Sequence, residues 1–203
     1  MAFIILLIIL VVFLSAFVTF TIVNIKMSAE TFNKLCSKKV SRIAKRNKYL
    51  AIANLNISNY SREKLGIKHV VFGSKYIYLI TDYMLKGIVS GEVNDNSWVY
   101  YNNIKRTTHY VSNLNMISDK NIQEFAGILG IKEDFIVSIS LIPNECDFKI
   151  NGLKSDRKFV VQYSSQKRCI KKLEQDDVDS LDKNQTYEQF KTIEKRNEEG
   201  QNN

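Results

Sequence analysis

Few side chains in this sequence have the types and spacing that catalysis or metal binding requires. Cys36, Cys146 and Cys169 lie far apart, and together with two histidines they complete no zinc-binding pattern. The sequence contains no glycine-rich phosphate loop, HExxH motif or G-x-S-x-G motif. His69 stands in an apolar run, which favours a hydrogen-bonded core histidine. We therefore expect reduced thiols, no metal ion and no cofactor.

Basic side chains form the most concentrated chemical feature of the chain. Residues 24–65 contain ten Lys or Arg residues opposed by Glu30 and Glu63, and this segment accounts for the net charge of +8 of the whole chain. Apolar residues recur there at helical spacing between the basic ones. The basic residues of this helical pattern form the predicted binding set for a membrane surface or for nucleic acid: Lys34, Lys38, Lys39, Arg42, Lys45 and Arg46.

An apolar run precedes the basic segment. Ala2–Val23 is 22 residues long and uncharged, and as a helix it would extend about 33 Å, close to the thickness of the hydrocarbon core of a bilayer. A cleaved signal peptide fits less well, because no basic residue precedes the run and no small-residue cleavage site follows it. The sequence therefore predicts one transmembrane helix.

Charge also predicts the orientation of this helix and the partner of the basic segment. The basic flank should stay in the cytoplasm, so we expect the N-terminus outside and the C-terminal domain in the cytoplasm. A basic segment beside a bilayer gains free energy from anionic lipid headgroups, which favours lipid over nucleic acid as its partner. Nucleic acid binding stays open as an alternative, and the sequence does not identify a protein partner.

The remaining pattern predicts an α/β domain with a mixed sheet flanked by helices. We expect an anchor over residues 1–24, a basic juxtamembrane helix over 25–49, the α/β domain over 50–173 and a polar tail over 174–203. Ser28 is the expected N-cap of the basic helix, and Ser118 or Asp119 that of a later helix, which should end at Gly130. Expected strands cover 50–57, 67–72, 76–81, 86–90, 97–101, 135–142, 146–150 and 158–163, and a last helix covers 166–173. The tail is poor in apolar residues, so we expect it to be flexible or to form a loosely docked helix.

The order of these elements resembles the nuclease-related domain (NERD) family, which has a restriction-endonuclease-like core. The resemblance covers about residues 30–162. It is carried by Lys68-His69-Val70-Val71, by the apolar run Tyr76–Ile80, and by the glycines Gly87 and Gly91 followed by Trp98. Farther along, Asn113, Asn121-Ile122 and the strand VSISLIPNEC are similar to the family's helix and next strand.

The resemblance implies catalytic positions, and this chain departs from the family at each of them. Nucleases of this type hold Mg²⁺ with carboxylates on adjacent strands and position water with a lysine. The family's Asp, Glu and Lys correspond here to Lys68, Thr81 and Tyr83. The family's helix Glu corresponds to Ser37, and its Gln corresponds to Ile117. These substitutions predict a nuclease-like domain that has lost catalysis and acts by binding.

Two alternatives remain open at this point. The domain could be a working Mg²⁺ nuclease that uses acids outside the family pattern, such as Asp82 and Glu92. Asp82 is adjacent to Thr81 on a predicted strand and should therefore point to the opposite face. The second alternative is a partner-binding module on a membrane anchor, with a fold unrelated to nucleases.

Overall fold

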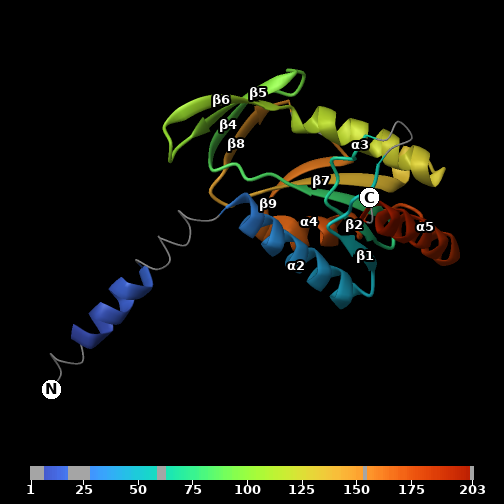
Figure 1. The fold of residues 1–203 in the computed structure, drawn as a ribbon, viewed down its shortest axis with the longest axis horizontal. Coiled ribbons are helices and arrows are strands. Elements are labelled where there is room, and N and C mark those ends of the chain that lie inside the picture. The colour runs from blue at the N-terminus through green and yellow to red at the C-terminus, as the bar shows by residue number, and fades with distance from the viewer. Residues whose placement is uncertain (1–6, 18–27, 59–62, 153–154, 202–203) are drawn as a thin grey trace.

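Two β-sheets, each with parallel and antiparallel strands, form the body of the protein (Figure 1). The structure is a computed structural model that describes residues 7–17, 28–58, 63–152 and 155–201. Helices flank the sheets. The expectation of an α/β protein with mixed sheet structure and flanking helices is confirmed, with two sheets in place of one.

The central sheet has the strand order β1-β2-β3-β7-β9. Its strands are β1 Leu50–Ala53, β2 His69–Phe72, β3 Ile77–Asp82, β7 Ile136–Ile142 and β9 Lys158–Gln162. β2 is antiparallel to both β1 and β3, whereas β3, β7 and β9 are mutually parallel. β3 lies in the middle, and its first five residues are buried, as expected from its apolar sequence.

Three strands of the second sheet come from the chain between β3 and the next helix. The fourth strand, β8, comes later in the sequence, after β7. The order of this sheet is β6-β5-β4-β8, with β4 Gly87–Glu92, β5 Ser97–Asn102, β6 Thr107–Ser112 and β8 Asp147–Asn151. Gly87 has φ +145°, and a Cβ atom there would lie 2.0 Å from the carbonyl oxygen of Tyr101, so only glycine lets the two strands approach so closely.

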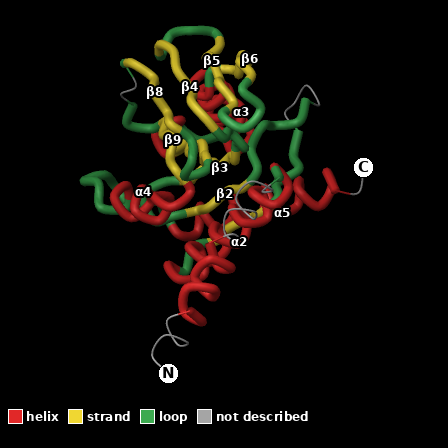
Figure 2. The backbone as a smooth tube through the Cα atoms, turned by 90° about the vertical axis from the view of Figure 1, so that its left-hand side faces the viewer, coloured by secondary structure: helices red, strands yellow, loops and turns green. Residues whose placement is uncertain are grey.

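Helices cover both faces of the central sheet. They are α2 Ala29–Asn47, α3 Leu114–Leu129, α4 Gln166–Leu173 and α5 Lys183–Gln201, with short 3₁₀ turns at Glu133–Phe135 and Tyr163–Ser165. α2 and α4 pack on one face, through a core that includes Phe32, Val40 and Ile170. α3 and α5 pack on the other face, through a core that includes Phe125 and Ile193. In the view of Figure 2, the second sheet lies above the central sheet and α2 lies below it.

Most predicted elements are present, but two expectations about the chain are wrong. α3 begins at Leu114 instead of near Ser118, because the side chain of Asn113 accepts hydrogen bonds from the backbone N–H groups of Asn115 and Met116 and caps the helix earlier. The segment 102–117, expected to hold no strand, contains β6. Gly130 ends α3 in the left-handed conformation as expected.

The C-terminal tail adopts one of the two forms expected for it, a docked helix. It forms α5, in which Phe190, Ile193 and Asn197 are buried. The ring of Phe190 packs edge-on against Phe72 of β2, with 5.7 Å between the ring centroids. Spacing by three and four residues brings these few apolar side chains to one face, so a mostly charged segment still docks on the core.

The N-terminal apolar run is described only in part. Residues 7–17 are helical, and their side chains are exposed. The rest of the predicted span, residues 2–6 and 18–23, lies outside the described residues. Among the residues that the structure describes, no helix is both long enough and apolar enough to cross a membrane.

Candidate functional site

The edge of the central sheet where β2 begins and β3 ends carries three of the predicted catalytic positions. His69 pairs with Ile80 across the antiparallel ladder, so Lys68 lies beside Thr81. Side chains alternate along a strand, and Lys68, Thr81 and Tyr83 therefore occupy one face of the sheet, the face covered by α3. Lys68 is exposed, Tyr83 is half-buried, and Thr81 is buried with 7% of its surface exposed.

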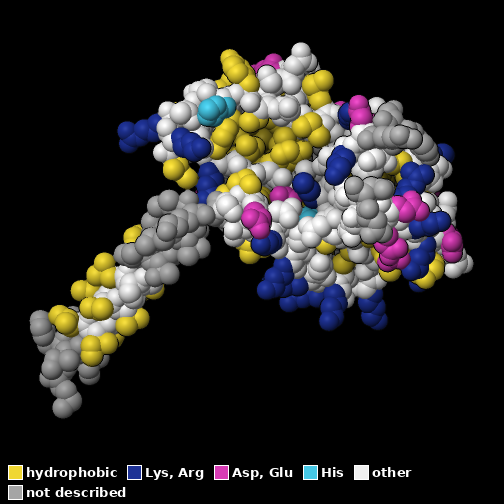
Figure 3. Space-filling model, in the orientation of Figure 1, with side chains coloured by type: hydrophobic (Ala, Val, Ile, Leu, Met, Phe, Trp, Pro, Cys, Tyr) yellow, Lys and Arg dark blue, Asp and Glu magenta, His cyan; other side chains and the backbone are white. Residues whose placement is uncertain are grey.

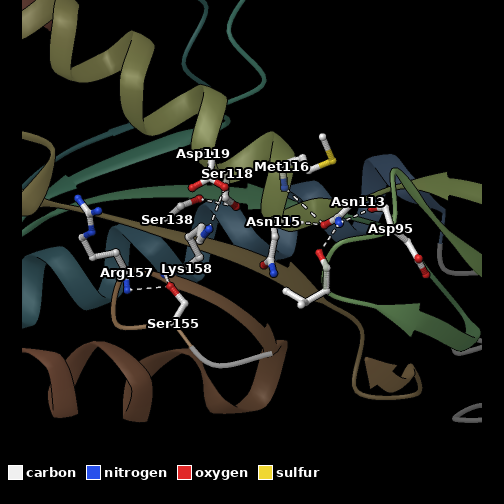
Figure 4. A network of polar contacts seen from close by, with 11 residues as sticks. Asp95, Asn113, Asn115, Met116, Ser118, Asp119, Ser138, Ser155, Arg157 and Lys158 are labelled. Carbon is white, nitrogen blue, oxygen red and sulfur yellow. Dashed lines mark hydrogen bonds and ion pairs between the residues drawn. The ribbon is translucent and has the colours of Figure 1, made fainter. Parts of the chain in front are cut away.

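A layer of neutral polar side chains surrounds Thr81 between the sheet and α3. Thr81 Oγ1 donates a hydrogen bond to the carbonyl oxygen of Gly66 at 2.8 Å. Ser138 Oγ donates to Ser118 Oγ of α3 at 3.0 Å, and Lys158 forms an ion pair with Asp119 at 2.8 Å on the rim of the layer (Figure 4). Asn115, Asn121 and Ser140 are also buried. The layer offers hydrogen-bonding groups near Thr81 but no carboxylate that is both buried and free of an ion pair.

Asp82 lies on the opposite face of the sheet, against α2. Its Oδ1 atom accepts a hydrogen bond from Asn33 Nδ2 at 3.0 Å and lies 3.7 Å from His69 Nε2. The backbone N–H of Asn54 donates to His69 Nδ1 at 3.2 Å. Ser37 Oγ lies 3.0 Å from Asn54 Oδ1 and 2.9 Å from the carbonyl oxygen of Asn33. We refer to these five residues as the Asp82 cluster.

A hydrogen bond within the Asp82 cluster determines the tautomer of the neutral His69 ring. Because Nδ1 accepts a backbone N–H, the ring proton of the neutral imidazole lies on Nε2, which faces Asp82. His69 is fully buried, and neither ring nitrogen is available to take a proton from a nucleophile. The expectation of a hydrogen-bonded core histidine is confirmed. The cluster joins α2 to the end of β3 and to the loop after β1.

The structure does not bring all the predicted catalytic positions together. Ser37 belongs to the Asp82 cluster on the α2 face, whereas Lys68, Thr81 and Tyr83 lie on the α3 face. Ile117 of α3 and Tyr83 are partly buried against the same hydrophobic core cluster. Mg²⁺ prefers hard anionic oxygens, and these positions supply a cation, a hydroxyl, a phenol and an alkyl group. The residues at the edge therefore do not fit the metal ion that the family resemblance implies.

The two acids of the alternative nuclease site, Asp82 and Glu92, do not lie in the same sheet. Asp82 ends β3 in the central sheet, whereas Glu92 ends β4 in the second sheet and accepts a hydrogen bond from Asn151 Nδ2 at 2.9 Å. Within the described ranges, no group of three or more His, Cys, Asp or Glu side chains could hold a metal ion.

Burial suppresses the reactivity of the three cysteines, which are all free thiols. Burial, together with the nearby negative charge of Asp82, raises the pKa of Cys36 to about 12. Burial likewise raises the pKa of Cys146 and of Cys169 to about 11. A cysteine nucleophile needs a lowered pKa, so these thiols do not have the properties of one.

The basic residues of α2 form a stripe on the side of the helix that faces away from the sheet. Lys34, Lys38, Arg42, Lys45 and Arg46 are exposed. Figure 3 shows Lys and Arg side chains projecting from the lower side of the body, where Figure 1 draws α2. Lys34 is neutralised in part by Glu30, 2.6 Å away.

Lys39, the remaining member of the predicted binding set, is engaged inside the protein. Its Nζ atom donates to the carbonyl oxygen of Tyr163 and lies 4.1 Å from the centroid of the Tyr163 ring. Burial lowers the pKa of Lys39. This lysine therefore ties α2 to the segment before α4 and is not part of the exposed stripe.

Four basic residues that the sequence analysis passed over lie on α4. This helix packs on the same face of the central sheet as α2, and its exposed side chains include Lys167, Arg168, Lys171 and Lys172. The acids at 174–182 conceal this cluster when charge is counted over the whole C-terminal region. The local run KRCIKK, with apolar residues at helical spacing, is the signal that could have revealed it.

Comparisons of the chain with protein-family models, with curated proteins and with solved structures find no match.

Proposed function

We propose that this protein is a membrane-anchored, nuclease-like domain without catalytic activity, which acts by binding. The proposed binding surface is the basic stripe of α2, with anionic lipid headgroups as its partner. The proposal has three parts: the type of core, the loss of catalysis and the attachment to a membrane. Each part is supported by a different observation.

The arrangement of the central sheet supports a restriction-endonuclease-like core. The chain runs α2, β1, β2 and β3, continues after the second sheet into α3 and β7, and β1-β2-β3-β7 are neighbours in that order. This is the element order on which the resemblance to the nuclease-related domain family rests, with a helix first, three antiparallel strands next, and then a helix and a strand parallel to the third.

The observation that carries the proposal is the state of the sheet edge. Lys68, Thr81 and Tyr83 stand at the positions where metal-dependent cleavage needs carboxylates and a lysine, and Asp82 is held on the other face by Asn33 and beside His69. A positive charge at the first of these positions repels a metal ion. The edge is therefore suited to holding the fold together and not to phosphodiester hydrolysis.

The membrane part of the proposal is supported by charge and by apolar length. The uncharged run Ala2–Val23 precedes α2, and the exposed basic stripe follows within the first helix of the domain. An exposed lysine or arginine near an anionic membrane surface gains about 1 kcal/mol, so several such residues acting together provide useful affinity.

The catalytic part is tested with the purified full chain in detergent. We expect no cleavage of DNA or RNA with Mg²⁺ or Mn²⁺, and no metal binding by isothermal titration calorimetry. Metal-dependent cleavage that disappears in Asp82→Asn would overturn the proposal and establish an active nuclease. A matched Asp147→Asn variant, at an exposed position of β8 in the second sheet, controls for a general loss of charge.

A second candidate is a partner-binding module, and the exposed edge strand β6 favours it. Among the strands that the structure describes, β6 pairs with β5 alone, and its residues are mostly exposed, so its other edge could accept a strand from another protein. Capture of a protein partner that is lost when Pro replaces Tyr110 would favour this function. An unchanged partner set would count against it.

A further inference from the structure

The turn between β5 and β6 exposes an apolar side chain between basic ones. Ile104 is 55% exposed at this turn, and Lys105 and Arg106 follow it and are also exposed. Turns are usually formed by Gly, Asn, Asp, Pro or Ser. The exposed isoleucine side chain is therefore not needed to form this turn. We refer to residues 103–106 as the hairpin tip.

The hairpin tip is held in one conformation by its own strand. Asn102 Oδ1 accepts hydrogen bonds from the backbone N–H groups of Ile104 at 2.9 Å and of Lys105 at 3.0 Å. Arg106 adopts a left-handed conformation with φ 52°, and the strands close the loop where Asn102 pairs with Thr107. Ile104 is therefore presented without the entropic cost of ordering a mobile loop on binding.

Aromatic and apolar side chains continue from the tip along one face of the hairpin. Tyr110 is 78% exposed, and Val99 and Tyr101 are each more than a third exposed. Val99 and Tyr110 are register partners on neighbouring strands, so their side chains share this face. Tyrosine at the margin of an apolar patch, with basic residues beside it, is the composition found at membrane–water interfaces.

The position of the tip indicates which partner it meets. The tip lies at the end of the body where α2 begins, which is the end from which the chain enters the domain (Figure 1). If the bilayer holds residues 2–23, the five chain steps to Ser28 keep the start of α2 within about 18 Å of its surface. Figure 3 shows Lys and Arg side chains at this end of the second sheet as well as below, over α2.

We propose that the hairpin tip is a further membrane contact, in which Ile104 enters the boundary between headgroups and acyl chains while Lys105 and Arg106 bind anionic headgroups. This inference rests on the membrane anchor of the proposed function. With the anchor and the stripe of α2, the tip provides a third point of attachment, and three points that are not in line define how the domain sits on the bilayer. A single helix followed by a linker leaves that orientation free.

The test uses the full chain in bilayers of phosphatidylserine and phosphatidylcholine. Ile104→Cys is labelled with an environment-sensitive fluorophore, and Val178→Cys, an exposed apolar position after α4, is the matched control. The unsubstituted protein corrects for labelling of the native cysteines. We expect a blue-shifted emission at position 104, loss of quenching by aqueous iodide, and quenching by lipids that carry a spin label in the upper acyl chain. Position 178 should remain open to iodide.

The outcomes separate this inference from the proposed anchor. Suppose that the protein stays in the bilayer during a carbonate wash, but iodide quenches the label at position 104 as strongly as the label at position 178. The inference about the hairpin tip is then wrong, and the membrane anchor is still supported. Release of the protein by carbonate would overturn the anchor and the inference with it.

The charged part of the contact has its own control. Lys105→Glu with Arg106→Glu should return the label at 104 to an aqueous environment. Lys183→Glu with Lys195→Glu makes the same change of charge on α5, at the opposite end of the body, and should not alter the label. Equal effects of the two pairs would contradict headgroup recognition by the tip.

Discussion

Burial differs among the positions that the proposed family resemblance aligns with catalytic residues. Thr81 is enclosed between the sheet and α3, whereas Lys68 is exposed at the same edge. We therefore expect Thr81→Glu to lower the free energy of unfolding by about 3 kcal/mol, because an unpaired carboxylate would be buried and the hydrogen bond to Gly66 lost. Lys68→Asp should change it by less than about 0.5 kcal/mol. Urea denaturation of a chain starting at Met27 measures both, and equal stability of the two variants would contradict the burial of Thr81.

The three thiols lead to a prediction about pH. At pH 8 a thiol with its ordinary pKa of 9.0 is roughly one-tenth ionised, whereas at a pKa of about 11 the ionised fraction is about one in a thousand. Alkylation by iodoacetamide in the folded protein should therefore be at least about 100-fold slower than in urea, since burial also limits access. Mass spectrometry after timed alkylation measures this, and rapid modification of Cys36 would contradict its burial.

The same thiols link stability to alkaline pH. Their pKa is higher in the folded chain than in the unfolded one, so the unfolded chain loses its protons first as pH rises. This contribution to stability is complete below about pH 9 and declines from there towards the folded pKa values of about 11 to 12. Urea midpoints measured between pH 8 and pH 10.5 should fall, and Cys36→Ser should reduce the fall.

The local sequence predicts which face of the sheet Asp82 lies on, but not which residues it contacts there. The alternation of a strand correctly separates Asp82 from Thr81, because it needs only neighbouring positions. The contact of Asp82 with Asn33 and with His69 depends on how α2 crosses the sheet and on the register of β2 with β3. No local pattern encodes that register, so the Asp82 cluster could not be predicted.

At the scale of elements, the basic stripe of α2 leads to a test of lipid binding. Lys38 and Lys45 are exposed on the same side of α2, about two turns apart, and neither forms an ion pair with another described residue. Lys38→Gln with Lys45→Gln should weaken binding of a chain starting at Met27 to phosphatidylserine vesicles by roughly 30-fold, at about 1 kcal/mol for each lysine. Vesicle sedimentation measures this.

The control for the stripe uses two lysines of the same exposure on another helix. Lys183→Gln with Lys195→Gln removes the same charge from α5 and should leave the affinity nearly unchanged. Added salt should release the unsubstituted chain from the vesicles. Equal weakening by both pairs would mean that net charge, and not the stripe, determines binding, and binding to DNA but not to lipid would favour the nucleic acid alternative.

The elements that the sequence predicted correctly are those with strong local patterns. α2 shows helical periodicity and a Ser28 cap, and β3 and β7 are mostly apolar. β6, in contrast, has the sequence TTHYVS with almost every residue exposed, so it shows no alternation of apolar and polar residues. This segment is a strand because its backbone pairs with that of β5. Such pairing depends on the tertiary structure and not on the local sequence.

For the whole molecule, the C-terminal segment connects the layers of the fold. Glu174, after α4, accepts hydrogen bonds from Tyr78 Oη at 2.6 Å and from the backbone N–H of Ser74 at 3.0 Å, which fastens the β2–β3 turn on the α4 side of the sheet. α5 then crosses to the other face, where Ile193 is fully buried. The chain from α2 to α5 thus belongs to one folded body.

Because α2 is part of the folded domain, both must lie on the same side of the membrane. Because α2 packs in the same core as β3 and α4, the basic flank cannot lie on one side of a membrane and the domain on the other. By the positive-inside rule, we expect both to lie in the cytoplasm. Protease added outside intact cells should therefore leave a C-terminal tag and residues 27–203 uncut, although the chain offers 29 Lys and Arg residues to trypsin. Cells made permeable provide the control, since trypsin should then cut exposed sites such as those of α2 and α4. Digestion of the domain in intact cells would show that the orientation is reversed, and the anionic inner leaflet would then no longer be the surface that α2 and the hairpin tip meet.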